Sequence, residues 1–359
     1  MLETRYRHGL ALLFGGLLGF AGGSPAWSGC PTGGQVTRDG WIVSYDSTNW
    51  DGLEVRNASF DGSLVLTRAK IVEWHDDYGA SGYVFTTGCS AGGGGFTIYP
   101  YGEVQVLDLP GSADGVAGFE IVGDFRMGSW GSSCNLRFDV HYQFFENGNF
   151  RIAMGAYGKG CGSGNTYRPV LRIDIAEVDA ADDVLARWNG SSWVDLTIED
   201  YFVPYAEAGH GPHAYDPGGH VARILEQSSG SGHLLEVDRG HLADPDLLDE
   251  PFLYYTRFHA DEGDAELPAL GTCCNNDHQQ GPQSYLNGES ISGEDLVIWY
   301  VPQLEAVTTV PYSCWTVSGE PNPETYPCFG GPLFRTTPGI FADGFEGGSV
   351  GRWSFAQLD

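Results

Sequence analysis

Histidine residues gather in one segment of this sequence, and histidine is a side chain that holds transition metals. His210, His213 and His220 lie close together in a stretch rich in glycine and proline. Neutral imidazole nitrogens bind zinc and copper, so these three residues form a candidate metal site. No strand or helix pattern fixes their spacing, and a loop with exposed histidines is the alternative. Asp277–His278, next to a pair of adjacent cysteines, is a second candidate, with oxidised cysteines as its alternative.

Other kinds of chemistry find little support in the sequence. No Gly-x-Ser-x-Gly elbow is present to indicate a serine hydrolase. The glycine run Gly92–Gly95 is followed by neither a lysine nor a helical pattern, so we interpret it as a flexible turn and not as a phosphate-binding loop. Some tryptophans could form a platform on which a sugar stacks, with packing in the protein core as the alternative reading. These are Trp188, Trp193, Trp299 and Trp315.

The ends of the chain have the character of targeting segments. Arg5 and Arg7 precede an apolar run over residues 9–20, and small residues follow up to Ser28. This order is typical of a secretory signal peptide, and the apolar run falls short of the roughly 20 residues that a membrane-spanning helix needs. We therefore predict a signal peptide at 1–28, one domain at 29–338 and a tail at 339–359. The tail resembles a terminal motif of proteins exported by Gram-negative bacteria, which predicts a secreted, periplasmic or cell-surface protein.

Eight cysteines in an exported chain favour disulfides over metal thiolates. Eight cysteines allow 105 pairings, and the sequence cannot choose among them. Local spacing suggests two pairs, Cys134 with Cys161 and Cys314 with Cys328. The adjacent Cys273 and Cys274 are expected to bond to different partners, because a bridge between neighbours is strained.

Short strands separated by Gly, Asp and Asn dominate the pattern of the chain. Asp61–Gly62 and Asn147–Gly148 each predict a hairpin turn, the second being the stronger signal. The segment 287–300 runs from an acidic, Gly-containing turn into a strand at 295–300 that we expect to be buried on both faces. Helical periodicity occurs only, and briefly, over 221–226. The sequence therefore predicts an all-β fold with two large packed sheets.

The charge of the chain excludes one class of partner. Its formal net charge is −29 at pH 7. Such a surface repels nucleic acid and anionic membranes through its long-range field. We therefore expect no nucleic-acid partner. The partner is expected to be an unidentified ligand or protein, and no apolar run in the mature chain is long enough to predict a membrane span.

Several stretches of the sequence resemble the catalytic domain of the copper amine oxidases. The segment 287–300, preceded by 255–262, carries the resemblance most clearly, and 51–62 and 138–148 agree with it. These patches cover about half of the mature chain. The resemblance implies a large antiparallel β-sandwich that is often dimeric, so a homodimer is an open alternative.

The same resemblance implies a copper ion and a quinone cofactor, but the residues that make them are replaced. Those enzymes form the quinone from a tyrosine in an Asn-Tyr-(Asp or Glu)-Tyr strand, and Leu136 stands at that tyrosine. Where their His-x-His copper ligands are expected, this chain has Asn165 and Tyr167, and no histidine follows His278 to act as the third ligand. For the catalytic base, Asp76 and Asp77 remain unresolved alternatives.

An acidic run lies where the related enzymes often hold a peripheral calcium ion. Asp174, Glu177 and Asp179 are its candidate ligands, because oxygen ligands in a loop suit calcium. A solvated acidic loop is the alternative. No cofactor is otherwise indicated.

These observations lead to three hypotheses about function. The first is an exported amine oxidase-like protein that has lost its quinone and copper and acts as a non-catalytic binding or structural protein. The second is an active copper- and quinone-dependent oxidase that converts primary amines to aldehydes with release of ammonia and hydrogen peroxide. The third is a carbohydrate-binding surface protein that uses exposed aromatic side chains.

Overall fold

The structure is a computed structural model, and it is all-β in the part of the chain that it describes. The described residues are 30–77, 82–90, 96–111, 115–158, 166–176, 183–203, 213–226, 230–237, 251–262, 281–305, 314, 324 and 326–337. Within them the only helical element is the short 3₁₀ turn η2 (Pro282–Tyr285). Among these residues no helix has the length and apolar character needed to span a membrane.

Two sheets are built mainly from antiparallel neighbours. From edge to edge, the first sheet contains β1 (Gly34–Arg38), β2 (Trp41–Ser47), β3 (Leu53–Phe60), β4 (Ser63–Asp77), β11 (Thr166–Ile175), β18 (Leu296–Val301), β17 (Phe252–Arg257) and β14 (Asp200–Phe202). The short strands β5 (Gly82–Thr87) and β19 (Leu304–Glu305) pair with the ends of β4 and β11.

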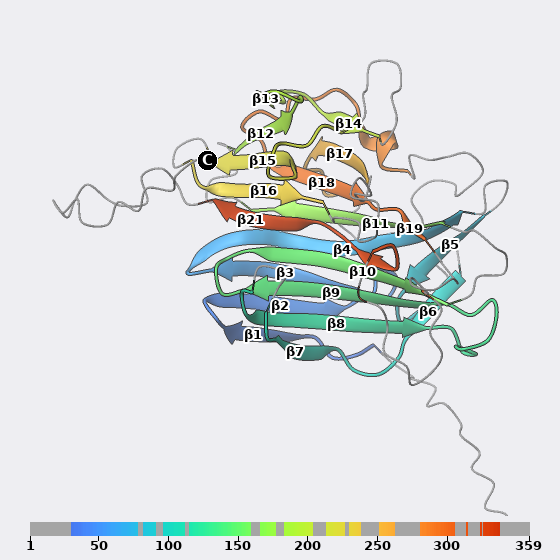
Figure 1. The fold of residues 1–359 in the computed structure, drawn as a ribbon. Coiled ribbons are helices and arrows are strands. Elements are labelled where there is room, and N and C mark those ends of the chain that lie inside the picture. Colours follow the sequence, from blue (N-terminus) through green and yellow to red (C-terminus); the bar gives the residue numbers. More distant parts are fainter. Residues whose placement is uncertain are drawn as a thin grey trace, which may run out of the picture.

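The second sheet is also built from antiparallel neighbours. Its order is β7 (Gln105–Leu109), β8 (Gly118–Arg126), β9 (Arg137–Phe145), β10 (Phe150–Tyr157), β21 (Leu333–Thr337), β16 (Gly232–Glu236), β15 (His220–Glu226), β12 (Asp183–Trp188) and β13 (Trp193–Asp195), with β20 (Phe329–Gly330) on the end of β10. Figure 1 shows the strands of both sheets running in similar directions, from β1 and β7 at the bottom to β12 and β14 at the top.

One strand links the two sheets. β6 (Phe96–Pro100) pairs in parallel with β5 of the first sheet and antiparallel with β8 of the second. The predicted antiparallel sandwich is therefore confirmed, with a parallel pair at this corner. A strand that changes sheets ties the two layers together at one end.

The core lies between the two sheets, where side chains of one reach the backbone of the other. The Trp41 indole of β2 donates a hydrogen bond to the Phe145 carbonyl of β9 at 2.8 Å. The Tyr142 hydroxyl of β9 lies 2.9 Å from the carbonyls of both Leu53 and Ala69, in β3 and β4. Buried polar groups cost free energy unless they are hydrogen-bonded, so these bonds fix the spacing of the layers.

The stretch around 287–300 folds as its sequence predicts. β18 is buried at every residue and lies between β11 and β17. Its alternate faces are covered by different groups: Ile298 packs in the core between the sheets, whereas Trp299 packs on the opposite face with Tyr285 of η2. A strand covered on both faces has continuous apolar sequence, which explains the run that identified it.

Local turn signals are confirmed, and one short helix prediction is wrong. Asp61 and Gly62 both have positive φ and connect β3 to β4, and Asn147–Gly148 connects β9 to β10. The segment 221–226, for which we predicted helical periodicity, belongs to strand β15. A register shift between His220 and Ala222 puts an irregularity into this strand, and that breaks the alternation of a regular strand and imitates a helical pattern.

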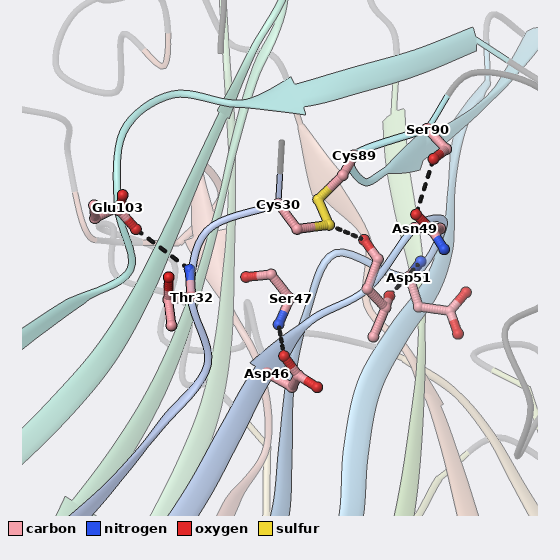
Figure 2. Close-up of a disulfide and its surroundings, with 10 residues drawn as sticks. Cys30, Thr32, Asp46, Ser47, Asn49, Asp51, Cys89, Ser90 and Glu103 are labelled. Carbon is pink, nitrogen blue, oxygen red and sulfur yellow. Dashed lines mark hydrogen bonds between the residues drawn. A yellow bond between two sulfur atoms is a disulfide. The ribbon is translucent and has the colours of Figure 1, made fainter. Parts of the chain in front are cut away.

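Two disulfides are placed with both partners among the described residues. Cys314–Cys328 is present as predicted, and Cys30–Cys89 is a pair that the sequence did not single out. Figure 2 shows Cys30–Cys89 beside the loop that connects β2 to β3, where the Ser90 hydroxyl donates to Asn49 Oδ1 at 2.8 Å. Cys134 is disulfide-bonded, and because Cys161 lies outside the described residues, its pairing stays a prediction. Cys273 and Cys274 also lie outside them.

Candidate functional site

Leu136, at the predicted position of the quinone precursor, lies just before β9 in the core between the sheets. Its side chain is buried, and its carbonyl accepts the Met127 N–H at 2.9 Å, which ties the start of β9 to the end of β8. A leucine side chain carries no oxidisable group. The residue at this position therefore cannot supply a quinone.

Four aromatic rings, which we call the aromatic cluster, pack between the sheets close to this point. Trp74 of β4 stacks on Phe138 of β9, with ring centroids 4.1 Å apart and planes inclined by 2°. Tyr167 of β11 and Phe85 of β5 meet the Phe138 ring edge-on, at 5.7 and 5.8 Å. All four are at most 5% exposed. Packing of aromatic rings therefore dominates the place where the resemblance implied a redox centre.

The residues at the predicted copper positions do not fit a copper ion. Tyr167 contributes its ring to the aromatic cluster, and Asn165 lies outside the described residues. His75, in the adjacent strand β4, is fully buried and lies 2.6 Å from Glu73, on the opposite side of the strand from Trp74. Within the described ranges no three side chains of His, Cys, Asp or Glu come together as a metal site.

The two aspartates considered for the catalytic base are both in β4. Asp76 is directly opposite Tyr167 in the pairing of β4 with β11, and it is buried. Residues directly opposite one another in a sheet share a face, so Asp76 lies on the same face as the aromatic cluster. Asp77 is the last residue of the strand.

The candidate metal ligands in the histidine segment have separate surroundings. His220 begins β15, and its Nδ1 lies 3.0 and 3.1 Å from the two carboxylate oxygens of Asp216. His213 lines a cavity described below. His210 and the pair Asp277–His278 lie outside the described residues.

Of the candidate calcium ligands, the structure places only Asp174. It lies within β11, is 1% exposed, and forms an ion pair with Arg172 at 3.4 Å. Glu177, Asp179 and the glycine run Gly92–Gly95 are outside the described residues. Calcium binding stays a prediction.

The tryptophans considered for sugar stacking differ in exposure. Trp299 is fully buried, stacks with Tyr285, and donates from Nε1 to the Thr256 hydroxyl at 3.2 Å. Trp188 and Trp193 are half-buried and meet edge-on at 5.5 Å across the hairpin of β12 and β13. Trp315 is outside the described residues. Trp299 thus serves packing, as the alternative reading expected.

A cavity of about 150 Å³ lies between the sheets, near the edge strands β13 and β14. Its lining comes from both sheets and from the residues around 213: Arg187, Trp188, Asn189, Phe202, His213, Ala214, Val221 and Tyr255. Phe202, Val221 and Tyr255 are also part of the core between the sheets. Asn189 is exposed, so the lining reaches the surface at the β12–β13 hairpin.

Three polar groups on this lining are enclosed without a hydrogen-bond partner in the described part of the chain. They are Arg187 Nε, His213 Nδ1 and the Tyr255 hydroxyl. His213 Nε2 lies 2.6 Å from the Pro251 carbonyl and must be the donor, because a carbonyl only accepts. Burial lowers the pKa of His213 to about 4, so at neutral pH its Nδ1 carries a lone pair and no proton.

The depressed pKa of His213 predicts a loss of stability in acid. An unfolded histidine titrates near 6.5, so the stabilisation is complete above that pH and is lost as pH falls toward about 4. A shift of this size corresponds to about 3 kcal/mol of unfolding free energy. Urea unfolding between pH 7 and 4.5 measures it, and the variant His213→Asn should fall less steeply with pH.

A second buried histidine limits how much of the acid-induced loss of stability the variant His213→Asn can remove. Burial also lowers the pKa of His233 to about 4, so part of the acid loss should persist in His213→Asn. An unchanged slope in that variant would show that His213 titrates normally in the folded protein. His220, paired with Asp216, is a suitable control position for the same substitution.

Sequence reasoning did not find this cavity. The segment of β15 was predicted to be helical, and His213 was considered only as a metal ligand. Nothing local marks the lining residues, because they meet only through the pairing of β12 with β15 and of β14 with β17. An arginine on the inward side of a strand, two residues after the buried Leu185, is the one signal the sequence offered.

Comparisons of the sequence with protein-family models and with curated proteins give no match. Solved structures do match in three dimensions. A copper-containing benzylamine oxidase from Hansenula polymorpha has a TM-score of 0.51 at 12% identity, over 86% of this chain and 60% of that chain. Pichia pastoris lysyl oxidase gives 0.50 at 14% and an amine oxidase from Aspergillus nidulans 0.50 at 13%, each over 84% of this chain and 51% of the other. The protein has an amine oxidase-like fold.

The likeness in three dimensions confirms the resemblance at the level of fold. At 12 to 14% identity it shows the fold alone. The chain spans 51 to 60% of the length of these three structures. The amine oxidase-like fold is therefore established, while chemistry must be argued from the residues of this chain.

Proposed function

We propose that this protein is an exported, non-catalytic binding protein that retains an amine oxidase-like fold without copper or quinone. The observation that carries this proposal is the aromatic cluster. Trp74, Phe138 and Tyr167 pack together close to Leu136. Tyr167 is not a histidine at the expected copper position, and Leu136 is not a tyrosine at the expected quinone position. A fold can be kept while its site is lost, because packing and chemistry place separate demands on the sequence.

The disulfides support the exported part of the proposal. Cys30–Cys89 and Cys314–Cys328 are of the kind that persists in oxidising compartments such as the periplasm or the extracellular space. Expression with its predicted signal peptide in a Gram-negative host, followed by fractionation, tests this part. Recovery of reduced protein from the cytoplasm alone would contradict it.

Metal analysis, quinone staining and a peroxide assay together test the loss of catalysis. After incubation with Cu²⁺ and dialysis, the protein should retain much less than one copper per chain. It should give no quinone redox stain, and it should release no hydrogen peroxide from benzylamine or from a lysyl peptide in the presence of oxygen.

The positive control is an active copper amine oxidase carried through the same steps. One copper per chain together with a quinone stain would refute the proposal and favour an active primary-amine oxidase. The variant Leu136→Tyr sharpens the test, because a tyrosine at that position should still give no quinone if the copper ligands are also missing.

A further inference from the structure

The cavity between β12, β14, β15 and β17 is separate from the aromatic cluster. None of its lining residues is Trp74, Phe85, Phe138 or Tyr167. Its walls come from strands at the opposite edge of both sheets from β1 and β7, and in Figure 1 these strands lie at the top. A ligand here would not occupy the position of a redox centre.

The Tyr255 hydroxyl is the strongest sign that this cavity has an occupant. Tyr255 is 1% exposed, and its hydroxyl has no hydrogen-bond partner in the described part of the chain. An unsatisfied buried polar group costs about 1 to 3 kcal/mol. Two further unsatisfied atoms, Arg187 Nε and His213 Nδ1, belong to the same lining. Three such groups around one space are the arrangement expected when a ligand completes the hydrogen bonds.

Arg187 sets the charge of the ligand. It is the one residue among those lining the cavity whose side chain carries a permanent charge. The guanidinium lies 4.5 Å from the Phe202 ring centroid, and this contact holds it between the sheets. Guanidinium groups bind carboxylates with charge-assisted hydrogen bonds, and a tyrosine hydroxyl nearby can donate another.

His213 and the cavity walls determine two other features of the ligand, its hydrogen-bond donor and its apolar body. His213 Nε2 donates to the Pro251 carbonyl, so in the neutral imidazole Nδ1 is the acceptor, and the ligand must bring a donor such as a hydroxyl. Phe202, Trp188 and Val221 give an apolar wall for the body of the ligand. A cavity of about 150 Å³ in another protein holds one benzene ring, which gives the scale of what fits.

We propose that this cavity binds a ring-sized hydroxycarboxylic acid, with the carboxylate on Arg187 and Tyr255 and the hydroxyl donating to His213. The proposal deepens the binding role proposed above and rests on it. The hydroxyl end and the carboxylate end lie on either side of an apolar ring that packs against Phe202.

Titration calorimetry with simple probes tests the ligand class. The probes are 3-hydroxybenzoate and 4-hydroxybenzoate, with benzoate and the corresponding hydroxybenzamides as controls. At least one hydroxybenzoate should bind. Its amide, which lacks the charge, should bind about ten- to hundredfold more weakly, the loss expected for a charge-assisted hydrogen bond. Benzoate, which lacks the hydroxyl, should bind several-fold more weakly.

Two variants place the binding in the cavity. Tyr255→Phe should lower affinity about tenfold while leaving the free protein at least as stable, because it removes a hydroxyl that has no hydrogen-bond partner among the described residues. Arg187→Gln should lower affinity by a similar or larger factor. The matched control is Arg223→Gln on β15, since Arg223 lies over the Trp193 ring at 5.3 Å and does not line the cavity.

The outcomes separate this inference from the proposal on which it rests. Equal affinity in wild type, Tyr255→Phe and Arg187→Gln, or equal binding of acid and amide, would overturn the assignment of the cavity. So would a lack of binding by every probe. None of these results bears on copper or quinone, which the metal and staining measurements decide independently.

Discussion

Replacing Lys70 with methionine is expected to lower the free energy of unfolding by about 3 to 5 kcal/mol. Lys70 of β4 and Asp51 of the loop between β2 and β3 are joined by a hydrogen-bonded ion pair of 2.5 Å, and both are 1% exposed. Burial lowers the pKa of Lys70, and the attraction of Asp51 opposes that shift. Removing the lysine would leave the Asp51 carboxylate buried without this partner.

Chemical denaturation of matched variants checks this prediction. The double variant Asp51→Asn with Lys70→Met should recover part of the loss, because the buried charge disappears with its partner. Arg38→Met is the surface control: Arg38 pairs with Asp108 at 2.6 Å, but Asp108 is 82% exposed, so the change should be less than about 1 kcal/mol. A loss in Lys70→Met no larger than in Arg38→Met would mean that the buried pair does not stabilise the fold.

The parts of the fold that could be predicted are those whose signals are local. Continuous apolar sequence identified β18, because a strand covered on both faces needs no polar residues. The dipeptide Asp61–Gly62 identified a hairpin, because these residue types tolerate the positive φ that the turn has in the structure. The prediction for 221–226 failed because the irregularity near His220 removes the alternation on which a strand assignment depends.

In the candidate site, too, only the features with a signal in the sequence could be predicted. Leu136 and Tyr167 could be assigned because the resemblance supplied their positions, and the structure then showed what surrounds them. The cavity could not be assigned, because Arg187, Phe202 and Tyr255 meet only after three strands have paired in two sheets. The same holds for the disulfides. Cys314–Cys328 joins residues 14 apart in the sequence and was predicted, whereas Cys30–Cys89 joins residues 59 apart and was not.

Removal of the Cys30–Cys89 disulfide is the second change with a large expected effect. The loop-entropy relation gives about 4 kcal/mol for a bridge spanning 59 residues, because the bridge restricts the unfolded chain. Urea unfolding of Cys30→Ser with Cys89→Ser measures this loss against wild type. A loss below about 1 kcal/mol would mean that the bridge closes a loop already restricted in the unfolded state.

The disulfide and the buried ion pair act on the same segment, so their effects should not add. Cys89 lies beside the loop that connects β2 to β3, where the Ser90 N–H donates to the Asn49 carbonyl at 3.1 Å, and Asp51 forms a bridge with Thr87. Figure 2 shows Asn49 and Asp51 next to the disulfide. If the bridge holds this loop against the end of β5, then Lys70→Met should cost at least about 1 kcal/mol less in the disulfide-free protein than in wild type. Simple additivity would instead show that the loop keeps its position without the bridge, leaving restriction of the unfolded chain as its whole contribution.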